Sequence, residues 1–202
     1  MSYRKEKKYR VTRAEQQQLK SSWLSSGMAP LYNTRQVSSI YFDTRDYSMY
    51  SQSEEGVLPR KKIRIRWYDD NKEFTLEKKI SSLEGRFKTS TRMCNINCFD
   101  NALKHIPIDQ NYGVLSPSLK VSYQRTYFSM NGMRITFDEN ISYQNLRQNN
   151  MIVHRDPELV IEIKIPVEIA DDYIEKIIPY STSRFSKYSR GLLISELQLS
   201  EI

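Results

Sequence analysis

The chain has 202 residues, of which 27% are charged, 39% hydrophobic and 11% aromatic, a composition that excludes disordered and collagen-like proteins. Lysine and arginine number 31 against 24 aspartate and glutamate residues, so the formal net charge is +7. Such a basic chain favours an anionic partner: nucleic acid, a phosphorylated metabolite or an anionic membrane surface. We expect a single domain over residues 1–202, because no linker or internal repeat divides the sequence.

Eight segments alternate apolar and polar residues, the pattern of strands with one buried face. They are rich in β-branched and aromatic residues, which are common in strands. In chain order they are Glu6–Val11, Val37–Asp43, Arg60–Tyr68, Glu73–Ile80, Arg86–Met93, Leu119–Phe128, Met133–Phe137 and Leu159–Ile165.

Helical signals are fewer. Thr12, with Glu15 three residues later, forms a capping box that predicts the start of a helix. The predicted helices are Arg13–Ser25, Asp46–Ser53, Cys98–His105, Ile169–Ile177 and Ser189–Leu199. The sequence therefore predicts an α+β fold dominated by antiparallel strands, with flanking helices.

Several other kinds of site and location are excluded. No apolar run approaches the roughly 20 residues that span a bilayer, and the charged N-terminus has no signal core, so we expect a cytoplasmic protein. Cys94 and Cys98 lack further metal ligands at zinc spacing and are predicted to be free thiols. His105 and His154 also lack a second ligand, so neither enters the predicted site.

The polar faces of the strands carry an unusual excess of cations. In residues 60–68, the cations alternate with isoleucine and tryptophan, so they share one strand face. Counted over all such faces, twelve cations stand against three carboxylates, Glu6, Glu77 and Glu162. The cations are Lys8, Arg10, Lys62, Arg64, Arg66, Lys79, Arg86, Lys88, Arg92, Arg125, Arg134 and Lys164.

Two interpretations of these faces stay open at this point. If the sheet closes with the charged faces inward, it encloses a wet tunnel for a polyanion, because so many charges cannot be desolvated. Arginine and lysine bind phosphate oxygens well, and carboxylates among them suit a divalent metal. Alternatively, the faces are simply solvated and the three glutamates form cross-strand salt bridges.

An ordered set of nine motifs runs through the chain. The motifs are Glu6-Lys-Lys-Tyr, Ser39-Ile-Tyr-Phe-Asp-Thr, Arg64-Ile-Arg-Trp-Tyr, Phe74-Thr-Leu-Glu-Lys-Lys, Gly85-Arg-Phe-Lys, Ser122-Tyr-Gln-Arg-Thr-Tyr, Met133-Arg-Ile-Thr-Phe-Asp, Val160-Ile-Glu-Ile-Lys and Phe185-Ser-Lys-Tyr. This set resembles the VTC domain, the polyphosphate polymerase domain of the vacuolar transporter chaperone complex and its bacterial relatives, within the CYTH-like triphosphate tunnel metalloenzymes. The resemblance extends from about Tyr3 to Gly191.

The resemblance implies a closed antiparallel eight-stranded β-barrel, the triphosphate tunnel fold. It also implies transfer of the ATP γ-phosphate onto inorganic polyphosphate with Mn²⁺ or Mg²⁺. The expected partners are ATP and polyphosphate or triphosphate, a separate membrane protein for any membrane association, and no nucleic acid.

Site residues follow from the resemblance together with the charged faces. Glu162 matches the family's metal-binding glutamate, with Glu6 and Glu77 as further metal ligands or structural residues. Lys187 matches a basic tunnel position and lies in a segment, Ser186-Lys-Tyr-Ser-Arg-Gly, that could open a helix. The predicted catalytic cations are Arg64, Arg66, Lys79, Arg125 and Arg134. The predicted substrate-binding residues are Lys8, Lys62, Arg86, Lys88, Tyr123, Lys164 and Lys187.

The first strand distinguishes branches of the superfamily. Its Glu-x-Glu-x-Lys signature is only partly present, because Arg4 replaces the first acid while Glu6 and Lys8 fit. This departure favours the polymerase branch over the triphosphatase and cyclase branches. No side-chain nucleophile is needed, because the acceptor's terminal phosphate oxygen attacks the γ-phosphorus directly.

Three alternative functions remain. One is an inorganic triphosphatase or polyphosphatase, and another is a non-catalytic sensor of polyphosphate or inositol phosphate. The third is a nucleic-acid-binding module, suggested by the pI of about 9.3 and by interleaved tyrosine and arginine. The acidic residues on the basic strand faces count against that third function.

Overall fold

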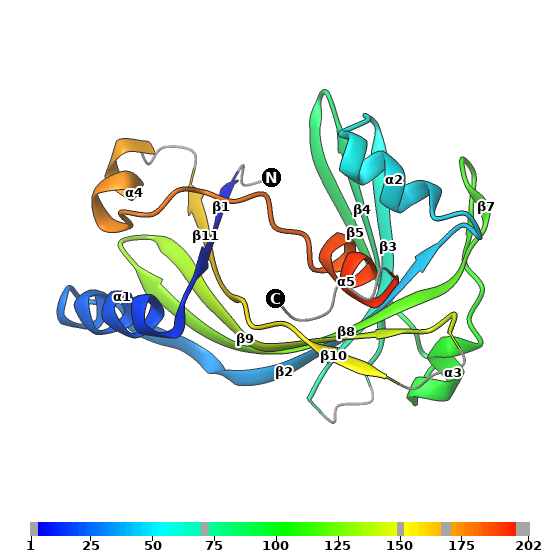
Figure 1. Cartoon of the computed structure of the whole chain (residues 1–202), viewed down its shortest axis with the longest axis horizontal. Helices are drawn as coiled ribbons and strands as arrows, with labels where there is room; N and C mark the ends of the chain where they lie inside the picture. Colours follow the sequence, from blue (N-terminus) through cyan, green and yellow to red (C-terminus); the bar gives the residue numbers. More distant parts are fainter. Residues whose placement is uncertain (1–3, 70–72, 149–151, 167–170, 197–202) are drawn as a thin grey trace. The chain divides into compact units, whose positions relative to one another are not determined.

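The computed structural model describes residues 4–69, 73–148, 152–166 and 171–196. The chain divides into two compact units. The first unit comprises residues 1–36, 123–141 and 156–185, and the second comprises residues 37–122, 142–155 and 186–202. Three long strands supply residues to both units: β2 (Ala29–Asp43), β8 (Ser116–Met130) and β9 (Met133–Asn145) (Figure 1).

In the first unit, the strands follow the order β1 (Arg4–Val11), β11 (Leu159–Pro166), β9, β8 and β2. Strand β11 is antiparallel to both of its neighbours. Asn131 and Gly132 join β8 to β9 with φ angles of 48° and 76°. Two residues with positive φ suit a tight hairpin, so β8 and β9 are antiparallel as well.

The core of the first unit lies on one face of this sheet. Ile161 and Ile163 of β11 are fully buried and belong to the same cluster as Trp23 and Ile174. Those two residues come from helices α1 (Arg13–Ser25) and α4 (Asp171–Ile177). Because Ile161 and Ile163 face these helices, Glu162 and Lys164, which alternate with them along β11, face the opposite side of the sheet.

The second unit is built on the strand order β8, β2, β3 (Arg60–Tyr68), β4 (Thr75–Ser82) and β5 (Gly85–Arg92). Strands β3, β4 and β5 form an antiparallel meander, and β10 (Val153–Arg155) pairs with β9. Strands β6 (Ile108–Asp109) and β7 (Gly113–Val114) form a separate two-stranded sheet. The helices are α2 (Ser48–Glu55), α3 (Phe99–Leu103) and α5 (Lys187–Glu196).

Its apolar core lies on the face of β3 that carries the isoleucines. Ile63 and Ile65 are fully buried and cluster with Met49 of α2 and Ala102 of α3. The cations of β3 alternate with these isoleucines, so burial of one face turns Lys62, Arg64 and Arg66 to the other.

The structure confirms the α+β fold dominated by antiparallel strands, since each of the eight predicted strands is present. The five predicted helices are also found: α1 has the predicted bounds, and the other four differ from theirs at one end or both. Residues 169–170 and 197–199 of the last two predicted helices lie outside the described residues. Closure of the sheet into a barrel and the single-domain organisation stay predictions.

Two smaller expectations can also be checked. Cys94 and Cys98 are free and exposed, as predicted. Among the helices of the described ranges, none has the length and hydropathy required to cross a membrane.

Helix α5 makes a close contact that can be tested. A Cβ atom at Gly191 would lie 2.4 Å from Tyr143 Cδ1 and 2.6 Å from Leu119 Cδ2. Alanine ordinarily stabilises a helix by about 1 kcal/mol relative to glycine. The steric overlap at this position costs more than that gain. We predict that Gly191→Ala lowers the free energy of unfolding by about 1–3 kcal/mol, measured by urea denaturation.

Leu193→Ala is the matched control, because Leu193 lies on the same helix and is exposed. We expect a change within about 0.5 kcal/mol for this control. A Gly191→Ala protein as stable as the wild type would contradict the packing of α5.

Candidate functional site

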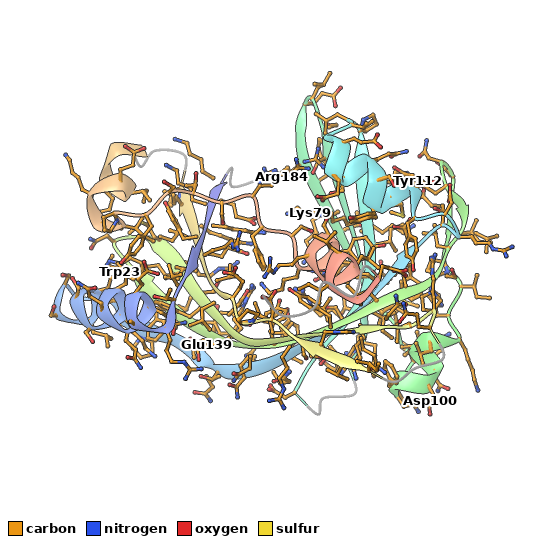
Figure 2. The ribbon with its side chains drawn as sticks, in the orientation of Figure 1. Trp23, Lys79, Asp100, Tyr112, Glu139 and Arg184 are labelled. Carbon is orange, nitrogen blue, oxygen red and sulfur yellow. The ribbon has the colours of Figure 1, made fainter. Side chains whose placement is uncertain are left out.

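Strand register collects most of the predicted cations of the second unit on one sheet face. Lys62 is opposite Lys79, which is opposite Lys88 in turn, and Arg64 is opposite Glu77. We call this surface the second-unit charged face; one of its residues, Lys79, is labelled in Figure 2. Its predicted site residues are Lys62, Arg64, Arg66, Glu77, Lys79, Arg86 and Lys88.

Glu77 neutralises the centre of this face. Its Oε2 accepts hydrogen bonds from Arg64, at 2.7 Å from Nε, and its Oε1 accepts from Lys88 Nζ at 2.6 Å. Arg66 Nη1 lies 3.9 Å from Oε2. Burial alone would raise the pKa of Glu77, but the charges of Arg64, Arg66 and Lys88 lower it to about 2. Glu77 is therefore an ionised hub that holds cations in place.

Tyr41 is a site residue that the sequence analysis missed. It is opposite Arg64 in β3, and Arg64 Nη1 donates to Tyr41 Oη at 2.7 Å. Burial opposes ionisation of this phenol, yet Arg64, Arg66 and Lys62 outweigh it and lower the pKa from 10 to about 8. Its position in the Ser39-Ile-Tyr-Phe-Asp motif, in step with Ser39, is the one signal that could have indicated it.

Helix α5 packs against this same face through Tyr188. Tyr188 stacks on Tyr41 with ring centroids 4.8 Å apart, and its hydroxyl donates to Asp43 Oδ2 at 2.5 Å. Burial and the Asp43 carboxylate raise the pKa of Tyr188 well above its ordinary value, so this donor keeps its proton. Through Tyr188, helix α5 therefore contacts Tyr41, the residue that accepts a hydrogen bond from Arg64.

The beginning of α5 also meets the charged face. Lys62 Nζ donates to Ser186 Oγ at 2.8 Å, and the same Oγ accepts from the Ser189 N–H at 3.3 Å. Ser186 is thus a helix cap, and Lys187 is the first residue of the helix. This placement of Lys187 agrees with the helix start suggested by its sequence segment.

The first unit carries a second such surface, the first-unit charged face, on β1, β11, β9 and β8. Lys8 is opposite Glu162, and Glu6 is opposite Lys164, so all four side chains share one face. Lys164 Nζ lies 3.3 Å from Glu162 Oε1 and 3.9 Å from Glu6 Oε2. Two carboxylates therefore lie around one ammonium group.

Arg125 is held differently from the arginines of β3. Its Nε and Nη2 lie 2.5 and 2.6 Å from the two oxygens of buried Asp138, a bidentate pair, and Nη2 is 3.8 Å from Glu162 Oε2. Although burial opposes the charge, Asp138 and then the nearby Tyr123 and Glu162 raise the pKa of Arg125 well above its ordinary value. Asp138 was not predicted as a site residue, and its pairing with Arg125 orients this cation.

The remaining predicted residues of the first unit also find places on or beside this face. Arg134 is opposite Lys164, and its buried Nε has no hydrogen-bond partner among the described residues. The Arg125 guanidinium carbon lies 5.2 Å from the ring centroid of Tyr123. Lys8 Nζ donates to the carbonyl of Phe185 at 3.0 Å.

The carboxylates of the two faces differ in how well they suit a divalent metal ion. Both oxygens of Glu77 already accept short hydrogen bonds from cations, so this carboxylate does not fit a metal. Lys164 Nζ and Arg125 Nη2 lie 3.3 and 3.8 Å from the two oxygens of Glu162, and Glu6 is diagonal to Glu162 across the strand pair. Two carboxylates fit an ion that takes its other ligands from phosphate and water. Within the described ranges, no group of three or more His, Cys, Asp or Glu residues forms a metal cluster.

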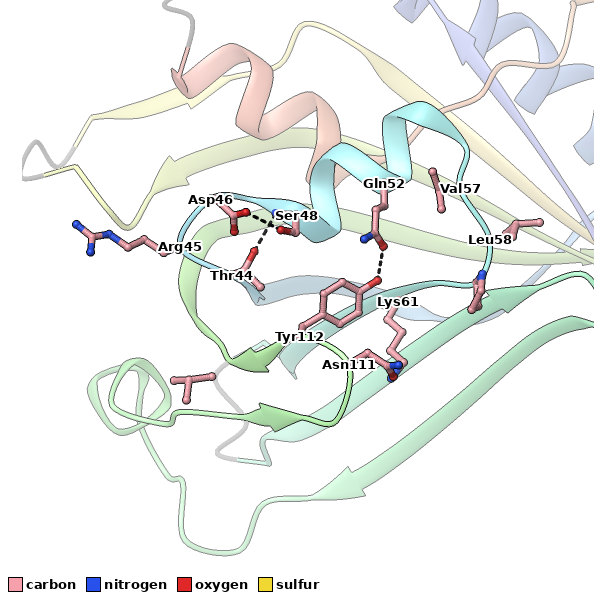
Figure 3. A pocket seen from close by; sticks show the side chains of 12 residues that line it. Thr44, Arg45, Asp46, Ser48, Gln52, Val57, Leu58, Lys61, Asn111 and Tyr112 are labelled. Carbon is pink, nitrogen blue, oxygen red and sulfur yellow. Dashed lines mark hydrogen bonds between the residues drawn. The ribbon is translucent and has the colours of Figure 1, made fainter.

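A separate cavity of about 650 Å³ lies in the second unit, beside α2 and the β6–β7 sheet (Figure 3). Tyr112 Oη donates to Gln52 Oε1 at 2.5 Å within its wall. Lys61, which also lines it, donates to Asp109 at 2.8 Å. None of the predicted site residues is among the described residues that line this cavity.

The fold and the two charged faces define an antiparallel sheet protein whose polar surfaces are organised around arginine and lysine. The family model for the VTC domain matches residues 3–108 and 100–195. The chain therefore belongs to the VTC domain family, as its motifs predicted.

Several solved structures share this fold. A candidate adenylate cyclase from Bacillus halodurans has 17% identity and a TM-score of 0.60, with 90% of this chain and 92% of that chain covered. The PH1819 protein from Pyrococcus horikoshii has 16% identity and a TM-score of 0.57, with 96% and 99% covered.

A candidate adenylyl cyclase from Hippeastrum, HpAC1, which shows a dominant triphosphatase activity, has 17% identity and a TM-score of 0.54, with 95% of each chain covered. No curated protein matches the sequence significantly. At these identities the likeness concerns the fold alone.

The Glu77 hub predicts a specific dependence of stability on pH. We expect Glu77→Gln to lower the free energy of unfolding at pH 7 by about 2–3 kcal/mol, after allowance for partial solvent exposure. Because the folded pKa is about 2, below the ordinary 4.5, the stabilisation by the carboxylate is present above pH 4.5 and is lost as the pH falls toward 2. Urea denaturation at pH 7, 5, 4 and 3 would follow the shrinking difference.

Glu73→Gln provides the control, since Glu73 pairs with Arg92 in an exposed salt bridge. An effect of about 0.5 kcal/mol or less is expected there. A constant difference between wild type and Glu77→Gln across this pH range would contradict the hub.

Tyr41 predicts a tyrosine that titrates early. Ultraviolet absorbance should show one phenol ionising near pH 8 in the wild type and absent from Tyr41→Phe. Since the folded pKa lies below the ordinary 10, the wild type should also gain stability over the variant as the pH rises from 8 to 10. Tyr50→Phe should keep the early phenol, because burial raises the pKa of Tyr50. Identical titrations of wild type and Tyr41→Phe between pH 7 and 9 would refute the assignment.

Proposed function

We propose that the protein is a metal-dependent polyphosphate polymerase that transfers the γ-phosphate of ATP onto a growing inorganic polyphosphate chain. The observation that carries the proposal is the second-unit charged face, where six of the predicted lysines and arginines share one sheet face with the ionised Glu77. Membership of the VTC domain family supports a phosphate chain as the anion. The proposal includes the closed tunnel that the family resemblance implies.

The arginines of this face are suited to phosphate. Arg64 is held by Glu77 and Tyr41, and Arg66 Nε donates to Ser39 Oγ at 3.1 Å. Because these contacts orient the guanidinium groups in advance, little conformational entropy is lost when phosphate oxygens bind. Lys79 and Lys88 on neighbouring strands add positive charge for further phosphates of the chain.

On the first-unit charged face, Glu162 and Glu6 would hold the divalent ion. When bound, Mn²⁺ or Mg²⁺ would neutralise phosphate charge as phosphorus changes partners. Arg125, oriented by Asp138, lies beside Glu162 and would stabilise the same charge. The acceptor's terminal oxygen forms the new bond to the γ-phosphorus while the bond to ADP breaks, so no covalent enzyme intermediate is required.

A triphosphatase or polyphosphatase is the second candidate, and one comparison favours it. The Hippeastrum protein that shares the fold shows a dominant triphosphatase activity. The same charged faces would then direct water to the γ-phosphorus. A sensor that only binds polyphosphate, acting on a separate membrane protein, would use these faces without turnover.

The decisive experiment follows phosphate by ³¹P NMR. Wild-type protein is incubated with ATP, Mn²⁺ and short polyphosphate, and a polymerase should increase the internal chain phosphates while ADP appears. Glu162→Gln should reduce this rate by more than about 100-fold with the fold intact, because a carboxylate that binds the ion is lost. Glu175→Gln, an exposed position on α4, is the matched control and should retain full activity.

Other outcomes identify the alternatives. Release of free phosphate without chain growth would indicate a triphosphatase, and tight polyphosphate binding without turnover under any ion would indicate a sensor. Tighter binding of an oligonucleotide than of polyphosphate of equal charge would indicate a nucleic-acid-binding module. Full activity of Glu162→Gln would remove Glu162 from the metal site.

A further inference from the structure

A tyrosine pair with an arginine lies on the first unit and has no part in the site described so far. Tyr32 of β2 and Tyr127 of β8 meet edge to face, with ring centroids 5.6 Å apart and an interplanar angle of 83°. The Arg35 guanidinium carbon lies 5.6 Å from the Tyr32 centroid and 6.0 Å from that of Tyr127. We call these three residues the Tyr32 cluster.

The cluster is exposed, in contrast to the other aromatic pairs of the first unit. Tyr32 retains 53% of its accessible surface although it contacts both partners, whereas Trp23 and Phe137, which also pair, are 3% and 1% exposed. Removing an aromatic ring from water is favourable, so an exposed ring beside a cation is a ready surface for another flat ring.

Strand geometry places the cluster next to the phosphate-directed residues. Tyr123, Arg125 and Tyr127 alternate along β8 and therefore project from the same face. Residues two apart on a strand are about 6.6 Å apart, so Tyr127 is the neighbour of Arg125 on this face, and Arg125 Nη2 lies 3.8 Å from Glu162 Oε2. A ligand whose phosphates reach Arg125 would bring its attached groups to the Tyr32 cluster.

We propose that the Tyr32 cluster binds the nucleobase of the nucleotide that donates phosphate. The base stacks on the exposed ring of Tyr32, and the Arg35 guanidinium adds a cationic contact to the base or to the nearest phosphate. This inference rests on the proposed function, because it assigns the base of a nucleoside triphosphate whose phosphates bind the first-unit charged face. An aromatic ring can stack on any base, so we expect similar affinities for different nucleotides. We also expect a nucleoside triphosphate to bind more tightly than inorganic triphosphate, which has no base to stack.

The test separates base binding from phosphate binding. Calorimetry measures the affinities of the full chain for ATP and for inorganic tripolyphosphate, each with Mg²⁺. Tyr32→Ala should weaken ATP binding about tenfold and leave tripolyphosphate binding within about twofold, because only the stacking partner is lost. Tyr32→Phe should keep the affinity of the wild type for ATP, since the ring is retained. Leu31→Ala, at the adjacent exposed position of the same strand, controls for disturbance of β2 and should change neither affinity.

Each other result overturns the proposal. An equal loss for ATP and tripolyphosphate in Tyr32→Ala would mean that Tyr32 supports the sheet or the phosphate contacts, and no loss for either would mean that no base binds there. A loss confined to single-stranded oligonucleotides would assign the cluster to nucleic acid. If wild-type protein binds neither ATP nor tripolyphosphate, the proposed function itself fails, a result distinct from tight tripolyphosphate binding with no base effect.

Discussion

Like charges on one face of a sheet must be neutralised, and the rest of this structure depends on that constraint. The carboxylate of Glu77 meets it in the second unit by accepting hydrogen bonds from Arg64 and Lys88, with Arg66 nearby. Because isoleucines occupy the other face of β3, these cations cannot turn away without exposing the core. Burial of the isoleucines of β3 therefore fixes the face on which its cations lie, and Glu77 neutralises them there.

The first unit meets the same constraint with a different residue. Asp138 is fully buried and binds Arg125 through both of its oxygens. Such a bidentate pair fixes the plane of the guanidinium group, whose Nη2 lies 3.8 Å from Glu162 Oε2. Asp138 thus orients the cation that lies beside Glu162, the residue that we propose as a metal ligand.

The relation between fold and reaction is looser. Chains with 16–17% identity share this fold, and one of them shows triphosphatase activity. A face that binds the three phosphates of a nucleotide serves hydrolysis, chain growth or binding equally well, since the difference is which oxygen reaches the γ-phosphorus. Features outside the phosphate contacts, such as the exposed Tyr32 ring, are therefore where a nucleotide could be distinguished from a bare phosphate chain.

The sequence by itself determined the eight strands, the start of α5 to within two residues and the residues that share each strand face. These features depend on alternation and capping, which are local properties of neighbouring residues. Tertiary structure decided the partners of those residues. The three cations at Glu77, the Asp138–Arg125 pair, the hydrogen bond from Arg64 to Tyr41 and the meeting of Tyr32 with Tyr127 all join different strands. Such contacts depend on the register between strands distant in the sequence, and alternation within one strand carries no information about that register.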